Sequence, residues 1–181
     1  MEEFKIYSVS DQYIEYLRQF EPNVYSNKSE NRSHTRKYIG TVIEMNGVKF
    51  FVPMSSPKET DYQIAGEEKV IKKSIIPIIR MTEKNNGVKE LKGTLRISHM
   101  IPVPESELIL YDLENESDKD YKALVISEAI FIRKNSEKIK NYAEIMYSQK
   151  KANDETGYVK SALNYIKLEE LCKEYSRQQN S

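Results

Sequence analysis

Residues 4–9 alternate between hydrophobic and polar positions, which predicts a β-strand there. Residues 38–45 and 48–54 are runs rich in β-branched and aromatic residues, which predict a pair of strands. Asn46-Gly47 lies between the paired strands, and this dipeptide readily takes the positive φ angles of a type I′ turn. The sequence therefore predicts a β-hairpin near the start of the chain.

Two further strands are predicted at residues 74–81 and 94–100. Pro77 has no N–H to donate to a neighbouring strand, so the first of these strands belongs at a sheet edge or a bulge. The polar stretches at residues 26–36 and 83–92 are predicted to be exposed loops.

Elsewhere the hydrophobic spacing changes to that of helices. Ser10 is positioned to cap a helix that begins at Asp11, and Tyr13, Tyr16 and Leu17 form its apolar stripe. Further helices are predicted at residues 119–132, 135–151 and 168–177.

Strands thus come first and helices later, without a regular β-α-β alternation. This order predicts an α+β fold, and we expect a small, strongly bent antiparallel sheet, an SH3-like barrel, flanked by helices. No Gly/Ser/Pro-rich linker divides the chain. We therefore expect a single domain, 1–181, with a sheet core at about 1–104 and a helical layer at about 105–181.

The charged residues are balanced in number but segregated along the chain. Basic and acidic residues number 28 each. Residues 28–58 hold six basic and two acidic residues, a net +4, whereas residues 105–128 hold eight acidic and two basic residues, a net −6. A locally basic segment can bind a polyanion even in a neutral protein, although such segments are more often solvated faces.

The sequence gives no indication of export or membrane insertion. The single cysteine, Cys172, excludes an internal disulfide and a thiolate-rich metal site. The N-terminus lacks the pattern of a secretion signal, and no apolar run approaches about 18 residues. We expect a soluble, cytoplasmic protein that does not associate with membranes.

Several common catalytic motifs are absent from the sequence. It contains no G-x-x-x-x-G-K-[ST] or G-x-G-x-x-G phosphate loop and no G-x-S-x-G nucleophile elbow. His34 and His99 lack the spacing of metal ligands, so we expect no metal and no cofactor. We interpret His34 as a loop residue and His99 as a strand residue, both outside the mechanism.

Ser55-Ser56-Pro57-Lys58 places two hydroxyls and one ammonium where the second hairpin strand is expected to end. Serines beside proline usually form ordinary turns. Hydroxyl and ammonium groups can also stabilise the negative charge that develops on a reacting phosphate. RNA cleavage needs no metal and no protein nucleophile, because the 2′-hydroxyl is already tethered beside the phosphorus. This stretch is therefore a candidate site for RNA cleavage.

Basic and aromatic residues nearby could hold an RNA strand. Arg36 and Lys37 precede the first hairpin strand and would lie near the same sheet end, unless they are simply a solvated strand end. Tyr13, Tyr25 and Tyr38 offer ring faces on which bases can stack. Tyr13, however, lies on the apolar helix stripe and is more typical of a core residue.

An ordered set of segments resembles the ToxN/AbiQ family, the endoribonuclease toxins of bacterial type III toxin–antitoxin systems. The resemblance extends from residue 4 to about residue 138, and it rests on the ordered set rather than on one diagnostic motif. The segments are Phe4-Lys5-Ile6-Tyr7-Ser8-Val9-Ser10, Tyr13-Ile14-Glu15-Tyr16-Leu17, Tyr38-Ile39-Gly40, Asn46-Gly47-Val48-Lys49-Phe50, Pro53-Met54-Ser55-Ser56-Pro57-Lys58, Met100-Ile101-Pro102-Val103 and Phe131-Ile132-Arg133-Lys134-Asn135-Ser136.

This resemblance implies a compact toxin, similar in its sheet core to the MazF and Kid toxins, that cuts single-stranded, often A-rich RNA without metal. The implied products are a 2′,3′-cyclic phosphate and a 5′-hydroxyl. The family pattern makes Ser56 the essential hydroxyl, Ser55 its companion and Lys58 the cationic partner. Arg36 occupies the basic position that the family places before the strand, whereas residues 59–75 show no family signature.

The resemblance also implies a repeated, pseudoknot-like RNA antitoxin, which the toxin processes and which bridges toxin copies into a closed assembly. The implied substrate is cellular or phage RNA. The candidate RNA-binding residues are Arg32, Arg36, Lys37, Tyr38, Tyr13, Lys72, Lys73, Arg133 and Lys134. Two alternatives stay open: an SH3-like module that binds RNA without cutting it, and a protein-interaction domain that uses residues 105–128 and the long helices.

Overall fold

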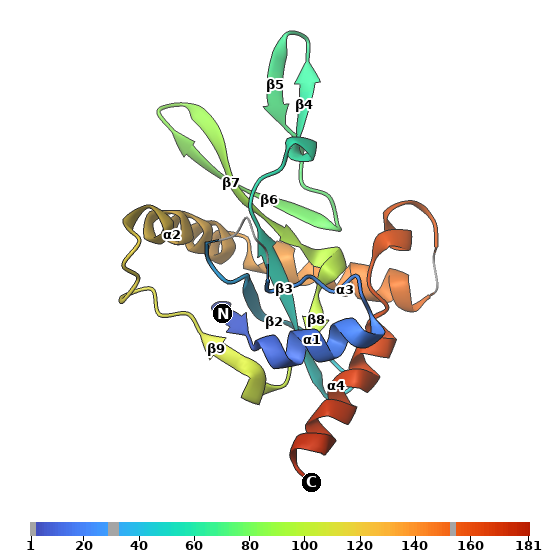
Figure 1. Cartoon of the computed structure of the whole chain (residues 1–181). Coiled ribbons are helices and arrows are strands. Elements are labelled where there is room, and N and C mark those ends of the chain that lie inside the picture. The colour runs from blue at the N-terminus through green and yellow to red at the C-terminus, as the bar shows by residue number, and fades with distance from the viewer. Residues whose placement is uncertain (1–2, 29–32, 153–154) are drawn as a thin grey trace.

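The structure is a computed structural model that describes residues 3–28, 33–152 and 155–181. Its main feature is a seven-stranded antiparallel sheet of order β6-β7-β3-β2-β1-β9, with β8 paired to β3. A separate hairpin of two strands projects from the body (Figure 1). The strands are β1 (Lys5–Val9), β2 (Lys37–Met45), β3 (Val48–Ser55), β4 (Tyr62–Ala65), β5 (Glu68–Ile71), β6 (Ile78–Asn85), β7 (Val88–Arg96), β8 (Ile101–Pro102) and β9 (Leu108–Leu110).

Helices cover the sheet and its ends. In Figure 1, α1 and α4 lie at one end of the molecule, and the β4–β5 and β6–β7 hairpins extend from the other. Helix α2 packs on β6 and β7, α3 on β2, and α4 on β8 and β3. The helices are α1 (Asp11–Phe20), α2 (Lys119–Lys134), α3 (Ser136–Lys151) and α4 (Tyr165–Gln179), and the short 3₁₀ turns are η1 (Glu59–Asp61), η2 (Ile97–His99), η3 (Glu105–Glu107) and η4 (Gly157–Ser161).

Local sequence signals correctly predicted the first helix and the first hairpin. The Ser10 side-chain oxygen accepts a hydrogen bond of 3.2 Å from the Tyr13 N–H and so caps α1. Strands β2 and β3 meet at Asn46 and Gly47, whose φ angles are 52° and 81°. Both angles are positive, as the predicted type I′ turn requires.

The prediction of an exposed loop at 83–92 is wrong. Strand β6 continues to Asn85, and β7 begins at Val88, so this stretch forms a second hairpin. Its turn, Asn86-Gly87, has φ angles of 49° and 82°. The strand predicted at 74–81 begins only after Pro77 and lies at the edge of the sheet, as the proline indicated.

The described strands do not close into a barrel. Strands β6 and β9 form the two ends of the main sheet and do not pair with each other. The expected SH3-like barrel is therefore corrected to an open sheet, and a likeness to the MazF and Kid toxins stays a prediction. Strand β9 also extends the sheet past residue 104, where a purely helical layer was expected.

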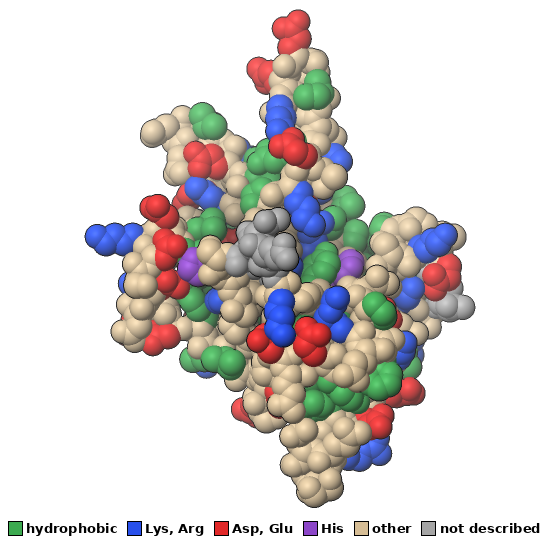
Figure 2. Space-filling view, viewed as in Figure 1, with side chains coloured by type: hydrophobic (Ala, Val, Ile, Leu, Met, Phe, Trp, Pro, Cys, Tyr) green, Lys and Arg blue, Asp and Glu red, His purple; other side chains and the backbone are tan. Residues whose placement is uncertain are grey.

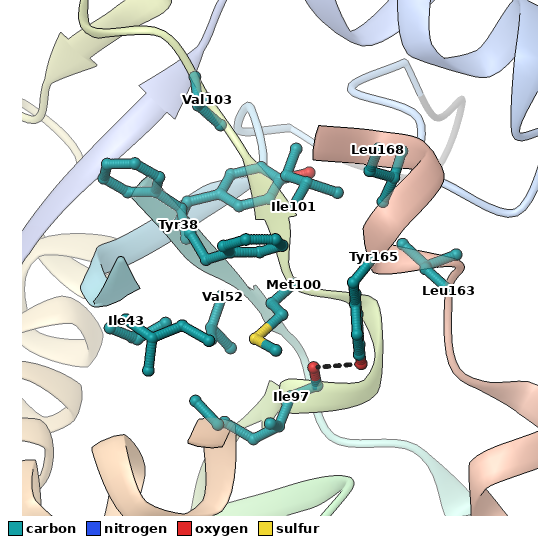
Figure 3. Close-up of a cluster of buried hydrophobic side chains, with 14 of the residues drawn as sticks. Tyr38, Ile43, Val52, Ile97, Met100, Ile101, Val103, Leu163, Tyr165 and Leu168 are labelled. Carbon is teal, nitrogen blue, oxygen red and sulfur yellow. Dashed lines mark hydrogen bonds between the residues drawn. The ribbon is translucent and has the colours of Figure 1, made fainter. Parts of the chain in front are cut away.

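The core lies between the sheet and the C-terminal helices (Figure 3). Ile43 and Val52 from the central hairpin pack there with Met100 and Ile101. Tyr165, at the start of α4, is buried in the same cluster, and its hydroxyl donates to the carbonyl oxygen of Ser98 at 2.9 Å. This packing fixes the end of β3 from which the candidate site begins. Among the described helices, none has the length and apolar character needed to cross a bilayer.

Candidate active site

A pocket of about 510 Å³ lies where β3 ends, between the segment that leads into β2 and the side of α2. We call it the active pocket. Three elements distant in sequence form its walls, and all members of the Ser-Ser-Pro-Lys stretch line it. Its lining residues are Tyr25, Ser33, His34, Thr35, Arg36, Lys37, Met54, Ser55, Ser56, Pro57, Lys58, Tyr121, Leu124 and Glu128.

The Ser-Ser-Pro-Lys loop is exposed, and a turn holds it at its far end. Ser55 is the last residue of β3 and is partly buried, whereas Ser56 and Lys58 are exposed. The Lys58 N–H donates to Oδ2 of Asp61 at 2.9 Å, and the Asp61 N–H donates to the Lys58 carbonyl oxygen at 2.9 Å. The backbone that carries Lys58 is therefore fixed although its side chain is open to solvent.

Arg36 lies beside the loop, as the hairpin geometry predicted. Its Nη1 donates to the Ser55 hydroxyl at 2.8 Å and to the Met54 carbonyl oxygen at 3.0 Å. Its guanidinium carbon lies 4.5 Å from the centre of the Tyr25 ring, a cation–π contact that restrains the side chain. Arg36 therefore orients the Ser55 oxygen and brings a positive charge to the loop.

Lys37 also lines the active pocket. Its Nζ donates to the Thr35 carbonyl oxygen at 2.8 Å and lies 5.1 Å from the ring centre of Tyr111 and 5.9 Å from that of Tyr121. Partial burial lowers the pKa of this ammonium, and the Glu116 carboxylate opposes that effect.

Glu128 is a site residue that sequence reasoning missed. Its side chain lines the active pocket and is only 7% exposed. Burial raises the pKa of this carboxyl to about 8, so it is largely uncharged at neutral pH and repels a phosphate little. Val125, Glu128 and Ile132 are the buried residues of α2, and their helical spacing was a signal that Glu128 lies on the apolar stripe.

Gly93 makes room for that carboxyl. A Cβ atom at this position would collide with Oε1 of Glu128 and would lie 3.1 Å from the Ser55 carbonyl oxygen. Glu128 therefore occupies the space beside the end of β3 that a larger residue at position 93 would fill.

His99, which was assigned outside the mechanism, lies next to the site. Its ring stacks on Tyr25, with 4.4 Å between the ring centres. Burial, and then the positive charges of Arg96, Arg36 and Lys58, lower the pKa of His99 to about 4. The imidazole is therefore neutral at physiological pH, and three cations lie within electrostatic range of it.

His34 connects the basic and acidic segments. Its ring stacks on Tyr121, with 3.6 Å between centres, and its Nε2 lies 3.1 Å from Oδ2 of Asp118. Because both His34 and Tyr121 line the active pocket, this contact forms one of its walls.

The prediction that Tyr13 and Tyr38 stack on bases is wrong, because both side chains are buried. Tyr13 is 0% exposed, and its hydroxyl donates to the Pro102 carbonyl oxygen at 2.6 Å. Tyr38 is 1% exposed within β2. Neither ring can receive a base. Tyr25 is partly exposed and lines the active pocket, but its ring already contacts Arg36 and His99.

The remaining predicted RNA-binding residues lie away from the active pocket. Lys72 and Lys73 line a second pocket of about 540 Å³, which we call the Arg96 pocket. Arg133 and Lys134 lie exposed at the end of α2, where Arg133 Nε is 3.6 Å from a Glu3 carboxylate oxygen. Arg32 lies outside the described residues.

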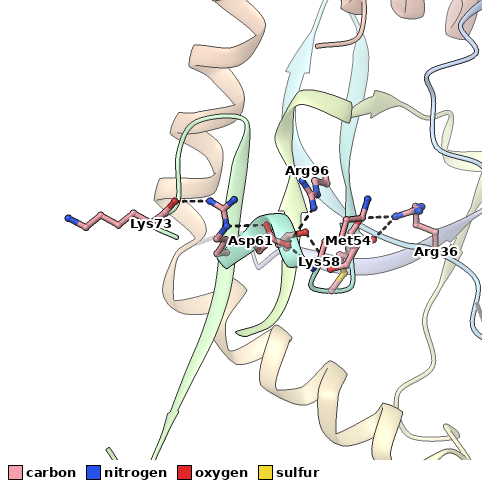
Figure 4. A network of polar contacts seen from close by, with 9 residues as sticks. Arg36, Met54, Lys58, Asp61, Lys73 and Arg96 are labelled. Carbon is pink, nitrogen blue, oxygen red and sulfur yellow. Dashed lines mark hydrogen bonds and ion pairs between the residues drawn. The ribbon is translucent and has the colours of Figure 1, made fainter. Parts of the chain in front are cut away.

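A row of polar contacts joins the two pockets (Figure 4). The Asp61 carboxylate, which accepts from Lys58, also accepts from Arg80 Nε at 3.1 Å, and Arg80 Nη1 donates to the Lys73 carbonyl oxygen at 2.8 Å. Figure 2 shows Lys and Arg side chains gathered between the base of the β4–β5 hairpin and the centre of this face. In the described ranges no group of three or more His, Cys, Asp or Glu side chains could hold a metal ion.

Comparison with known proteins places this geometry in a family. The chain matches the family model of the toxin ToxN, type III toxin–antitoxin system, over residues 5–173. It is 33% identical to the endoribonuclease AbiQ of Lactococcus lactis subsp. lactis, with 96% of this chain and 90% of AbiQ covered. It is 29% identical to the endoribonuclease ToxN of Pectobacterium atrosepticum, with 96% and 95% covered.

Solved structures agree with the sequence matches. The structure of AbiQ, a lactococcal anti-phage endoribonuclease, superposes with a TM-score of 0.78 at 30% identity and covers 97% of this chain and 99% of its own. A structure from a type III system whose toxin is inhibited by a non-coding RNA pseudoknot has the same TM-score at 27% identity, with 97% and 99% covered. The chain belongs to the ToxN family of type III toxin–antitoxin systems.

Proposed function

We propose that this protein is a metal-independent endoribonuclease toxin that cleaves single-stranded RNA, with a preference for A-rich sequences. The observation that carries the proposal is the exposed Ser55-Ser56-Pro57-Lys58 loop in a pocket that also holds Arg36. The related proteins ToxN and AbiQ, both named endoribonucleases, support the assignment.

The proposed reaction is an attack within the RNA itself. The 2′-hydroxyl gives up its proton as its oxygen bonds to the adjacent phosphorus, the bond from phosphorus to the 5′-oxygen breaks, and the departing 5′-oxygen takes up one proton. A 2′,3′-cyclic phosphate and a 5′-hydroxyl result. Because the nucleophile is already tethered, the protein's contribution is alignment and charge stabilisation.

The two serines and the lysine of the loop, and Arg36 beside it, each have a role in this proposal. The Ser56 hydroxyl donates to a non-bridging phosphate oxygen, and the Lys58 ammonium stabilises the charge that accumulates there. Arg36, which donates to Ser55 Oγ, holds that hydroxyl in place and adds a second positive charge. Tyr25, whose ring stacks on His99 and lies under the Arg36 guanidinium, holds that guanidinium beside the loop.

The proposed partner is a repeated, pseudoknot-like RNA antitoxin that the toxin processes and that joins toxin copies into a closed assembly in the cytoplasm. The related system inhibited by an RNA pseudoknot supports this part of the proposal. Lys37, Lys72, Lys73, Arg133 and Lys134 would contact phosphates, which position an RNA without specifying its sequence.

The first prediction is that Ser56→Ala abolishes growth inhibition and RNA cleavage while the fold is retained. Cleavage of total RNA is measured in EDTA, and folding is checked by circular dichroism and thermal melting. Ser117→Ala, at an exposed serine outside the active pocket, is the matched control and should remain toxic. A fully active Ser56→Ala protein would remove the loop from the mechanism, and RNA binding without cleavage by the wild type in EDTA would favour the non-catalytic module.

A further inference from the structure

The Arg96 pocket is strongly cationic. Its lining includes Lys72, Lys73, Arg80 and Arg96 against a single carboxylate, Asp61, which gives a formal charge of +3 from four cations and one anion. Such an excess in a concave surface attracts a polyanion.

The carboxylate is already fully engaged. Asp61 is 0% exposed, accepts from the Lys58 N–H and from Arg80 Nε, and lies 3.7 Å from Arg96 Nη2. Arg80 in turn donates to the Lys73 carbonyl oxygen. These contacts satisfy Arg80 but leave Arg96 with an ion pair that is too long to be a hydrogen bond.

Arg96 therefore has donors to spare. Its side chain is 10% exposed, and its Nε and Nη2 atoms have no hydrogen-bond acceptor within the described part of the chain. Leaving buried charged donors unsatisfied is costly, so such groups normally meet an acceptor. The planar guanidinium matches the paired oxygens of a phosphodiester.

The Lys58–Asp61 turn separates this pocket from the active pocket. Lys58 lines one pocket and Asp61 lines the other. The Lys58 N–H donates to the Asp61 carboxylate, and the Asp61 N–H donates to the Lys58 carbonyl oxygen. Phosphates repeat along an RNA strand, so a strand that crosses this turn from Lys58 would bring a flanking phosphate to Arg96.

We propose that the Arg96 pocket is a second phosphate subsite, which binds a phosphodiester flanking the one that is cleaved at the Ser-Ser-Pro-Lys loop. The inference rests on the proposed function and adds a direction to it: the RNA strand runs across the turn toward the base of the β4–β5 hairpin. Lys72 and Lys73, which line the pocket, add to the positive potential around that phosphate.

The test uses the full chain and a short 2′-O-methyl oligoadenylate, which keeps its phosphates but lacks the attacking hydroxyl. Each phosphate is replaced in turn by a neutral methylphosphonate, and affinity is measured by fluorescence anisotropy. For the wild type we expect two separated positions at which replacement weakens binding about tenfold. Arg96→Gln should become insensitive at one position, and Lys58→Ala at the other.

A second variant guards against misfolding of Arg96→Gln. The double variant Lys72→Ala/Lys73→Ala changes side chains that line the pocket, and it should make the slope of log affinity against log salt less negative by about 0.7 for each lost phosphate contact. Lys140→Ala, which removes an exposed charge on α3, is the matched control and should leave the two-position pattern intact.

Kinetics separate this inference from the proposed function. With cleavable single-stranded RNA, the Lys72→Ala/Lys73→Ala variant should raise KM and leave kcat unchanged, whereas Ser56→Ala should lose kcat and keep both sensitive phosphate positions. One sensitive position in the wild type, or two in Arg96→Gln, would overturn the subsite while cleavage stood. If a duplex of equal length loses more affinity than the single strand in Arg96→Gln, the pocket serves folded RNA and the proposal is also overturned.

Discussion

Glu128 is a carboxyl group held inside a pocket that is otherwise suited to anions. Its pKa, raised by burial from the ordinary value of 4.5 to about 8, means that folding keeps a proton on this group over a wide pH range. The unfolded chain releases that proton near the ordinary value. Stability contributed by the neutral form is therefore present below about pH 4.5 and is lost progressively as the pH rises toward 8.

We predict that Glu128→Gln removes this loss, because the amide has a similar shape and carries no charge. At about pH 9 the variant should exceed the wild type in free energy of unfolding by an amount on the order of 4 kcal/mol, with little difference at about pH 4. Urea denaturation across this range measures the effect. Glu137→Gln, at an exposed position on α3, should follow the wild type, and an unchanged pH slope in Glu128→Gln would contradict the assignment.

At the scale of elements, the η1 turn is the junction of the site. Asp61 ends this turn, and it joins the backbone of Lys58 to the side chains of Arg80 and Arg96 on β6 and β7. The position of the Ser-Ser-Pro-Lys loop therefore depends on buried ion pairs between η1 and the β6–β7 hairpin.

Asp61→Asn tests that dependence. The amide leaves two buried guanidinium groups without a counter-charge, so we expect a loss of about 3 kcal/mol in the free energy of unfolding, measured in urea. Cleavage should fall as well, because the amide has one acceptor oxygen in place of the two that now serve the Lys58 N–H and Arg80 Nε. Glu59→Gln is the control from the same turn: Glu59 is 87% exposed and pairs with Lys69, and its loss should cost less than about 1 kcal/mol.

Elements fixed by adjacent residues could be predicted from the sequence. The Ser10 cap and the Asn46-Gly47 turn act over a few residues, and both are present. The Asn86-Gly87 hairpin was missed although it carries the same turn signal, because its strands are rich in charge and alternate weakly. The position of the Glu128 side chain depends on the space left by Gly93, which lies 35 residues earlier in the chain. No local sequence pattern indicates a contact between residues so far apart.

At the scale of the whole molecule, charges that are segregated in sequence meet in space. His34 contacts Asp118, and Lys37 lies over the rings of Tyr111 and Tyr121, so the acidic segment packs against the basic one. The protein is neutral overall, yet the active pocket keeps cations at its loop. Net charge alone therefore conceals the site.

We predict that binding of single-stranded RNA weakens steeply with salt. Contacts from Arg36, Lys37 and Lys58 should give a slope of log affinity against log salt of about −2, and the Arg96 pocket should make it about −3. Anisotropy titrations between about 50 and 200 mM salt measure the slope. A slope near zero would favour the protein-interaction domain instead.

The β4–β5 hairpin stands away from the main sheet, with its turn at Gly66 and its base closed by a hydrogen bond of 2.8 Å from the Lys72 N–H to the Asp61 carbonyl oxygen. Lengthening a surface turn costs little free energy, whereas displacing a hydrogen-bonded base moves whatever is attached to it. A fluorophore or affinity peptide can therefore be inserted at the tip of this hairpin without loss of structure. A single residue added at its base would displace the turn that carries Asp61, and with it one wall of the active pocket.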